Sequence, residues 1–140
     1  MDTERQMIVA HDITELPAAR DELRLYLQKC RLPADVSYDL LTCVQEACKN
    51  ALRFADSPRG VHTWVVVGSD EIVATVRDFG AGLARGSLPT APPDPDSESG
   101  RGLFLMQALM DRVELRVDHG TELRLHKLLP AGPARGARAA

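Results

Sequence analysis

The sequence predicts an α+β fold, a two-layer sandwich in which about three helices cover one face of a mixed, mainly antiparallel sheet. Two observations support this fold class. Two amphipathic helical segments come first, and two pairs of β-rich segments follow, separated by one short helical segment. The chain has 140 residues, enough for one domain with a proper core. We expect a single domain over residues 1–130 and a disordered tail over 131–140.

The chain is expected to open with a short strand and a helix. Residues 6–10 form an apolar run of the kind found in edge or pairing strands. Asp12 or Thr14 is placed to cap a helix that carries Pro17 in its first turn and runs to about Arg31. Apolar residues recur at helical spacing along this segment, which predicts one buried stripe.

A second helix is expected from Pro33 to about Phe54, before a dense turn signal at 56–60. Its apolar residues share one broad face: Leu40, Val44, Ala47, Cys48, Ala51 and Ala55. Glu46 and Asn50 lie four residues apart, so they project from the same side of the helix. Such a pair is commonly a solvated flank. However, a carboxylate can take a proton from a hydroxyl, and a carboxamide oxygen suits Mg²⁺.

Two hairpins are expected to form most of the sheet. The first joins strands 61–67 and 72–77 through a connection at 68–71. The second joins strands 113–117 and 122–128 through a short turn. Both pairs are rich in β-branched residues, which strands favour.

A glycine motif and a proline-rich loop follow the first hairpin. Asp78, Gly80 and Gly82 end the second strand of that hairpin abruptly. An acid at this place can accept a hydrogen bond from an amino group such as that of adenine, and glycines let the backbone approach a ligand closely. Residues 84–99 are rich in proline and acidic residues, which predicts a mobile loop or lid able to close over a nucleotide.

A second glycine motif, Gly100-Arg101-Gly102, opens a helix expected over residues 103–111. Backbone amides at the N-terminus of a helix form a site for phosphates. Each glycine motif alone is more often a turn or a helix start. The order and spacing of the polar pair, the two glycine motifs and the loop together indicate a nucleotide site.

Composition excludes several classes of protein. The net charge of −3 gives no electrostatic case for direct nucleic-acid binding. No apolar run has the length of a membrane span, and the N-terminus lacks the segments of a signal peptide. Cys30, Cys43 and Cys48 have the character of small core residues in a reduced, cytoplasmic protein, and their spacing indicates no metal cluster.

Three segments resemble the motifs of a known family. VQEACKNALRFA, RDFGAG and SGRGLFLMQALMDRVEL are similar to the N-box, the first glycine box and the second glycine box of the GHKL, or Bergerat-fold, ATPases. Within this superfamily the chain looks like the small stand-alone anti-sigma-factor serine/threonine kinases of bacteria. The resemblance covers about residues 5–129, and the third segment is its most specific part.

The resemblance assigns a role to each matching residue. It implies that Glu46 is the general base for the attacking hydroxyl, and that Asn50 ligates the Mg²⁺ that bridges the phosphates of ATP. Asp78 would hold the adenine amino group. Gly80 and Gly82 would shape the adenine pocket. Four residues would lie by the phosphates: Gly100, Arg101, Gly102 and Leu103.

Residues beside the polar pair complete the comparison with the family. Lys49 and Arg53 occupy positions where the family often has basic or polar residues, and they either reach phosphate or stay solvated. Phe54 departs from the pattern, because many relatives carry histidine there. An apolar residue at this position implies altered packing beside a retained ATP site.

The resemblance implies an ATP- and Mg²⁺-dependent serine/threonine protein kinase that acts as an anti-sigma factor. Such a protein binds a sigma factor and phosphorylates a STAS-domain anti-anti-sigma antagonist. It forms a homodimer through the N-terminal part of the domain. The transfer would be in line, and it would depend on positioning, Mg²⁺ and a base.

Other functions are kept as alternatives. The main one is a non-catalytic module, nucleotide-binding or nucleotide-free, that sequesters a regulatory partner; a base in register with Asn50 argues against it. A sensor histidine kinase fits less well, because the histidines fall in the N-terminal loop, strands and turns: His11, His62, His119 and His126. A piece of a larger regulator is also considered, although Met1 and the basic tail favour a complete chain.

Overall fold

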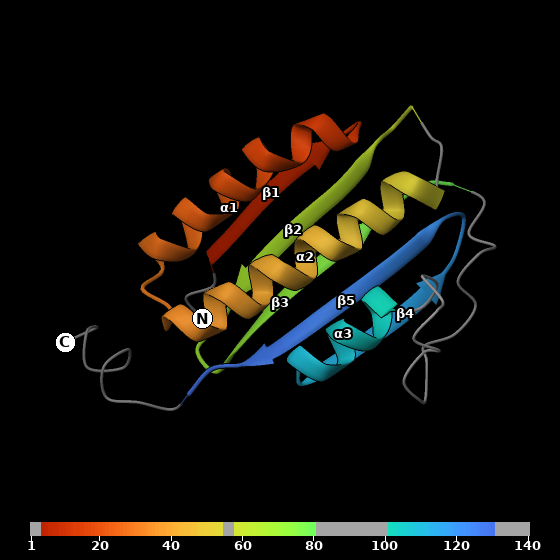
Figure 1. The fold of residues 1–140 in the computed structure, drawn as a ribbon. Coiled ribbons are helices and arrows are strands. Elements are labelled where there is room, and N and C mark those ends of the chain that lie inside the picture. The colour runs from red at the N-terminus through yellow and green to blue at the C-terminus, as the bar shows by residue number, and fades with distance from the viewer. Residues whose placement is uncertain (1–3, 55–57, 81–100, 131–140) are drawn as a thin grey trace.

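The computed structural model describes residues 4–54, 58–80 and 101–130, and the side chains at positions 4, 5, 54 and 101 lie outside that description. Within these residues the chain forms two layers, a five-stranded sheet with three α-helices against one face (Figure 1). The strands are β1 (Glu4–Ala10), β2 (Val61–Val67), β3 (Glu71–Arg77), β4 (Arg112–Val117) and β5 (Thr121–Leu128). The helices are α1 (Leu16–Lys29), α2 (Ala34–Phe54) and α3 (Arg101–Leu109), with a 3-10 turn η1 (Ile13–Glu15) before α1.

The described sheet is antiparallel throughout. Its strand order is β1-β2-β3-β5-β4, so the two hairpins meet through β3 and β5 while β1 and β4 form the edges. The predicted α+β sandwich with helices on one face is therefore confirmed. Where the sequence allowed a mixed sheet, each pairing between the described strands is antiparallel.

The start of α1 differs in detail from the sequence prediction. Asp12 caps η1, where its Oδ1 atom accepts the Thr14 amide at 2.8 Å, and α1 itself begins at Leu16 with Pro17 in its first turn. The helix ends at Lys29, before Arg31 adopts a left-handed conformation with φ of 58°. A left-handed residue just after a helix is a common way to end it.

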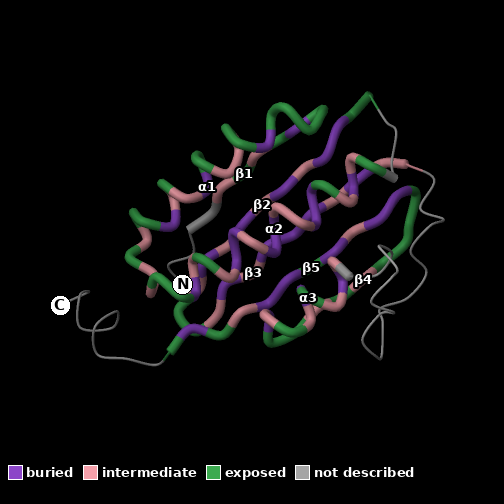
Figure 2. The backbone as a smooth tube through the Cα atoms, in the orientation of Figure 1, coloured by how far each residue is buried: buried purple, intermediate pink, exposed green. Residues whose placement is uncertain are grey.

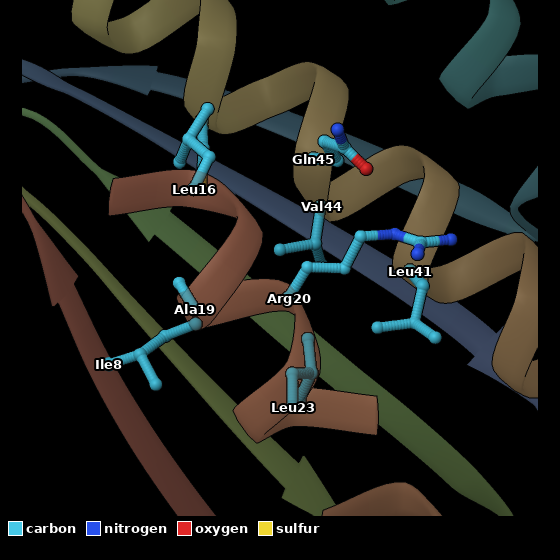
Figure 3. Close-up of a pocket in the computed structure, with 9 residues that line it drawn as sticks. Ile8, Leu16, Ala19, Arg20, Leu23, Leu41, Val44 and Gln45 are labelled. Carbon is cyan, nitrogen blue, oxygen red and sulfur yellow. The ribbon is translucent and has the colours of Figure 1, made fainter. Parts of the chain in front are cut away.

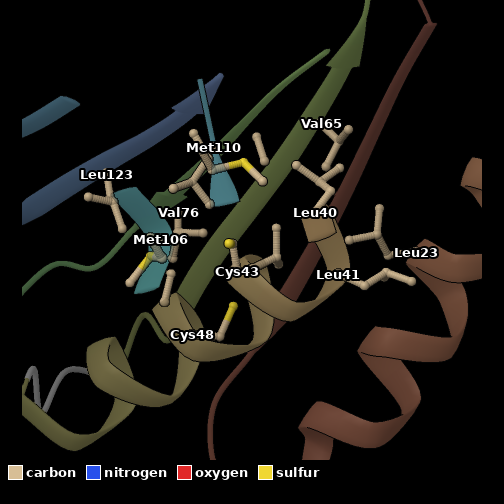
Figure 4. Close-up of a cluster of buried hydrophobic side chains, with 14 of the residues drawn as sticks. Leu23, Leu40, Leu41, Cys43, Cys48, Val65, Val76, Met106, Met110 and Leu123 are labelled. Carbon is tan, nitrogen blue, oxygen red and sulfur yellow. The ribbon is translucent and has the colours of Figure 1, made fainter. Parts of the chain in front are cut away.

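Helix α2 lies at the centre of the helical layer and packs against β2, β3 and β5 (Figure 1). Its predicted apolar face is buried at each described position: Leu40, Val44, Ala47, Cys48 and Ala51. Figure 4 shows this face meeting side chains from the sheet and from α3, among them Val76 and Met106. Buried positions follow the inner side of α2 and the central strands, whereas the outer side of α1 is exposed (Figure 2).

A small apolar cavity lies between α1, α2 and β1 (Figure 3). Its volume is about 20 Å³, close to the space that one water molecule needs. Arg20 of α1 extends beside it towards α2, and the Arg20 Nε atom has no hydrogen-bond partner among the described residues. The residues that line the cavity include no predicted site residue, so we interpret it as a packing feature between the two helices.

In the described part of the chain, no helix has both the length and the apolar character that crossing a bilayer requires. Some sequence predictions fall elsewhere. The turn residues 55–57, the lid expected over 84–99 and the tail expected over 131–140 lie outside the described residues.

Candidate functional site

Glu46 and Asn50 lie on α2, one turn apart, at the border of its buried face. The helix forms because its apolar residues recur at helical spacing and pack on the sheet, and this packing fixes where the two polar side chains emerge. The Glu46 Oε1 atom is 3.6 Å from the Lys49 Nζ atom. With 27% of its side chain exposed, Glu46 is accessible to an approaching hydroxyl.

The first turn of α3 lies directly against this polar pair. A Cβ atom added to Gly102 would be 2.7 Å from Glu46 Oε2 and 2.9 Å from Asn50 Nδ2, closer than real Cβ contacts. Glycine is therefore what lets the α3 backbone approach α2 at this point. The structure thus brings together a carboxylate, a carboxamide and the start of a helix, whose free amides are donors for phosphate.

A cleft of about 420 Å³ opens beside Glu46 and Asn50. Four predicted site residues of α2 line it: Glu46, Lys49, Asn50 and Arg53. The rest of the lining comes from Leu52 of α2 and from three residues that follow β1, His11, Asp12 and Ile13. The volume lies in the range of small-molecule sites. Sequence reasoning gave residues 11–13 no role in the site, because nothing in their local pattern connects them to α2.

Asp78 is buried at the end of β3, with 2% of its surface exposed. Its Oδ1 atom accepts the Gly80 amide at 3.2 Å and the Thr121 amide at 3.0 Å. Its own amide donates to the Thr121 carbonyl oxygen at 2.9 Å. These bonds orient the carboxylate, which suits the recognition of a purine amino group. Asp78 does not line the cleft beside Glu46, so within the described residues the two parts of the predicted site are not one pocket.

The sequence predicted a turn before β5 but assigned no role in the site to Gly120 or Thr121. A Cβ atom on Gly120 would lie 2.2 Å from the Asp78 carbonyl oxygen, and its φ of 131° is one that other residues rarely adopt. The turn before β5 can therefore pack on Asp78 only because residue 120 is glycine. Thr121 and Asp78 are 43 residues apart, so no local signal joins them.

The other predicted residues lie in the core, along the cleft, or outside the described part of the chain. Leu103 is buried in the core, so a contact with phosphate would come from its backbone amide. Lys49 and Arg53 are exposed along the cleft, where their charges can meet an anion. The rest lie outside the described residues or side chains: Gly82, Gly100, Arg101 and Phe54.

The cysteines of α2 belong to the core. Burial raises the pKa of the Cys43 thiol to about 12. Burial also raises the pKa of Cys48, whose Sγ atom lies 3.3 Å from Thr63 Oγ1. Both thiols therefore stay protonated at neutral pH and are poor nucleophiles. The described residues hold no group of three or more His, Cys, Asp or Glu suited to a metal ion, and magnesium bridged to phosphates does not need one.

Proteins of known name resemble this chain over part of their length. It is 34% identical over 102 residues to the Serine-protein kinase RsbW of Bacillus licheniformis, and 35% identical over 104 residues to the protein of that name from Bacillus pumilus (strain SAFR-032). Each match covers 65% of this chain, and the chain spans 64% of the length of each relative.

A solved structure supports the fold. The RsbU and RsbW domains of Rv1364c from Mycobacterium tuberculosis match with a TM-score of 0.68 and 17% identity, over 92% of this chain and 34% of that chain. In addition, residues 9–127 match the family described as Histidine kinase-like ATPase domain, and this range contains the polar pair of α2, the Asp78 turn and α3. The chain therefore belongs to the histidine kinase-like ATPase domain family.

Proposed function

We propose that this protein is an ATP- and Mg²⁺-dependent serine/threonine protein kinase that acts as a cytoplasmic anti-sigma factor. It binds a sigma factor and phosphorylates a STAS-domain anti-anti-sigma protein. Membership of the histidine kinase-like ATPase family supports nucleotide binding. Similarity to proteins named serine-protein kinase supports transfer of a phosphoryl group to a protein hydroxyl.

The observation that carries this proposal is the approach of Gly102 to Glu46 and Asn50. It brings the start of α3, where backbone amides can bind phosphate, beside the proposed base and the proposed metal ligand. The geometry supports a site in which phosphate, metal and base act together.

The chemistry of the side chains fits Mg-ATP. Bound Mg-ATP would supply the phosphoryl group, and its metal would neutralise charge on the phosphates. Asn50 offers a carboxamide oxygen, a hard ligand of the kind that Mg²⁺ prefers. Asp78 offers an oriented acceptor for the adenine amino group. Lys49 and Arg53 add positive charge along the cleft, which favours an anion there.

The contacts of the two Glu46 oxygens support its proposed role as the base. Oε2 faces Gly102 at the start of α3, and Oε1 faces Lys49, which lines the cleft. A serine or threonine hydroxyl that enters through the cleft would therefore meet a carboxylate already beside the phosphate site. Glu46 would accept the hydroxyl proton while the hydroxyl oxygen attacks the γ-phosphorus of ATP in line, the bond to the bridging oxygen breaks and ADP leaves.

We also propose a homodimer formed through the N-terminal part of the domain. β1 is an edge strand, and its Met7 and Val9 side chains are 48% and 41% exposed. An exposed apolar edge strand is a ready template for pairing with another chain, which supports dimerisation through β1. Sedimentation of the wild type should give the mass of a dimer and sedimentation of Met7→Glu that of a monomer; a monomeric wild type would contradict this point.

Calorimetric titration with ATP, with and without Mg²⁺, tests the site. The wild type should bind ATP in an Mg²⁺-dependent manner, and Asn50→Ala should lose that dependence because the carboxamide ligand is gone. Equal affinity in both proteins would remove Asn50 from the metal role. A wild type that binds no ATP would replace the kinase proposal with a nucleotide-free module that sequesters its partner.

A second variant separates binding from transfer. Glu46→Gln should bind ATP as the wild type does, but it should transfer phosphate to a STAS-domain protein of the same organism roughly 10²- to 10⁴-fold more slowly. Gln45→Ala, one residue away on α2, is the matched control and should transfer at the wild-type rate. Undiminished transfer by Glu46→Gln would rule out its role as base.

A further inference from the structure

Arg77 is the last residue of β3 and stands immediately before Asp78. It lies opposite Glu122 of β5 in the antiparallel register, and its Nη1 atom is 3.6 Å from the Glu122 Oε1 atom. The side chains of Arg77 and Glu122 are only 21% and 13% exposed. Ion pairs withdrawn from water in this way are screened less than surface pairs. The guanidinium group is therefore held in a defined place.

The same guanidinium group reaches the turn that precedes β5. Its Nη2 atom donates a hydrogen bond to the Asp118 carbonyl oxygen at 3.0 Å. Asp118 also closes this turn, because its amide donates to the Gly120 carbonyl oxygen at 3.0 Å. Arg77 thus joins the end of β3 to the turn through a backbone oxygen, independently of the strand ladder.

This turn delivers the hydrogen bonds that orient Asp78. The Thr121 amide donates to Asp78 Oδ1 at 3.0 Å, and Gly120 packs directly on the Asp78 carbonyl oxygen. A displacement of the turn would therefore move the donor of the Asp78 carboxylate. Because directed hydrogen bonds weaken steeply with misalignment, a small displacement is enough to loosen the carboxylate.

Arg77 also contacts the residue on the other side of Asp78. Its Cζ atom is 5.1 Å from the centre of the Phe79 ring, and the Arg59 Cζ atom is 3.7 Å from it. The His62 ring meets Phe79 edge-on, with the ring centres 4.9 Å apart. Cations over an aromatic face attract it. Asp78 is thus flanked by two neighbours, Arg77 and Phe79, that are in contact with each other.

We propose that Arg77 is a positioning residue for adenine recognition. By holding the turn at 118–120 and the Phe79 ring, it keeps the Asp78 carboxylate in the orientation that accepts the adenine amino group. Arg77 itself does not touch the nucleotide. This inference rests on the ATP-binding function proposed above, and it adds a determinant of base specificity at a residue to which the family resemblance assigns no role.

The chain offers a matched control in Arg124 of β5. Its Nε atom is 3.1 Å from Glu122 Oε2, so Arg124 and Arg77 bind the two oxygens of the same carboxylate. Arg124 is 49% exposed. Of the two arginines that bind Glu122, it is Arg77 that donates to the Asp118 carbonyl oxygen and contacts the Phe79 ring. Arg124→Gln therefore removes an arginine from Glu122 while leaving the connection to Asp78 in place.

The first test is amide hydrogen exchange in the nucleotide-free protein. Arg77→Gln should speed exchange of the Thr121 amide relative to the Leu125 amide in the middle of β5, and Arg124→Gln should not. Arg77→Lys should recover only part of the protection, because one ammonium group cannot reproduce the fork that joins Asp118 and Glu122. Equal acceleration at Thr121 and Leu125 would show a general loss of stability and would overturn the inference.

The second test is nucleotide affinity measured by calorimetry with ATP and with GTP. Arg77→Gln should weaken ATP binding about fivefold, the effect of one misaligned hydrogen bond, while GTP affinity stays the same. Arg124→Gln should keep the wild-type preference for ATP. If Arg77→Gln and Arg124→Gln show the same ATP affinity, Arg77 has no part in recognition and the inference is wrong. A wild type that binds neither nucleotide would defeat the ATP proposal, and the exchange measurement alone would then decide whether Arg77 holds Asp78.

Discussion

Gly102 is required where α3 meets the polar pair of α2. The space for its missing Cβ is occupied by the end of the Glu46 side chain and by the Asn50 amide nitrogen. A larger residue here must displace side chains that the proposed chemistry needs in place. The glycine is therefore explained by the approach of α3 to α2, and not by the ease of starting a helix.

Gly102→Ala is expected to separate stability from activity. Alanine favours a helix by up to about 1 kcal/mol over glycine, so α3 should be at least as stable. The added methyl group should shift Glu46 and Asn50, and we expect phosphoryl transfer to fall roughly tenfold or more, because misplacement of reacting groups is costly. Thermal unfolding and the transfer rate, measured on the same preparation, check both halves.

Gly68→Ala is the control for this substitution. Its added Cβ would meet the Glu71 carbonyl oxygen at 3.3 Å in the connection between β2 and β3, without meeting a site residue. Transfer by this variant should equal that of the wild type. A Gly102→Ala protein with wild-type transfer would show that the contact with α2 has no role in positioning.

Helix α2 does two things at the scale of the element. Its inner face supplies buried core residues, and the border of that face presents Glu46 and Asn50 to α3 and to the cleft. The position of the polar pair therefore depends on how the apolar face packs. A substitution that leaves a cavity in that face should mainly lower the free energy of unfolding. It should also, to a smaller extent, disturb the positions of Glu46 and Asn50.

Leu40→Ala tests the structural part of this role. Leu40 has no exposed surface, and removing a fully buried leucine side chain typically destabilises a domain by roughly 2–5 kcal/mol. Urea unfolding should show this loss. Leu25→Ala on α1, where the side chain is 54% exposed, should change the free energy of unfolding by less than about 0.5 kcal/mol. Equal effects in the two variants would contradict the burial assigned to α2.

The buried thiols give a prediction for the whole molecule. The Cys43 pKa is raised by burial from 9.0 to about 12, so the folded state holds this proton more tightly than the unfolded chain. The corresponding stability is complete below pH 9 and is lost as the pH rises from 9 towards 12. The stability of the wild type should therefore fall more steeply over this range than that of Cys43→Ala, as measured by urea unfolding.

Thiol labelling provides an independent check on the same property. Cys43 and Cys48 are buried and Cys30 is half-buried. A thiol reagent at pH 8 should modify Cys30 before the other two in the folded protein, and all three at similar rates in denaturant. Rapid labelling of Cys43 in the folded state would contradict its burial.

The fold was predictable from the sequence at the level of elements. The apolar spacing of α2, the β-branched runs of the two hairpins and the turn signals between them are local properties, and each element formed within about two residues of its predicted bounds. The start of α1 was less predictable, because both Asp12 and Thr14 were possible caps. In the structure Asp12 accepts the Thr14 amide and caps a 3-10 turn that precedes α1.

The candidate site was predictable only where its residues share a motif. Glu46, Asn50 and Asp78 stand out because of their order and spacing relative to the two glycine motifs, whereas each of them alone is an ordinary feature of a helix flank or a turn. Thr121 had no such signal, since its link to Asp78 is a backbone hydrogen bond made across the sheet. Arg77 begins the RDFGAG segment, but nothing in that segment indicates that its side chain reaches the turn before β5.

Local patterns in the sequence were enough to predict the fold class, the helices and strands, and a set of residues with the chemistry of a candidate nucleotide site. These predictions depend on spacing and composition, which act over a few residues. The tertiary structure was needed to find that Gly102 meets Glu46 and Asn50, and that Arg77 binds the turn at 118–120, which orients Asp78. Such contacts arise from the order of strands and the packing of helices, and they join residues that the linear pattern leaves far apart.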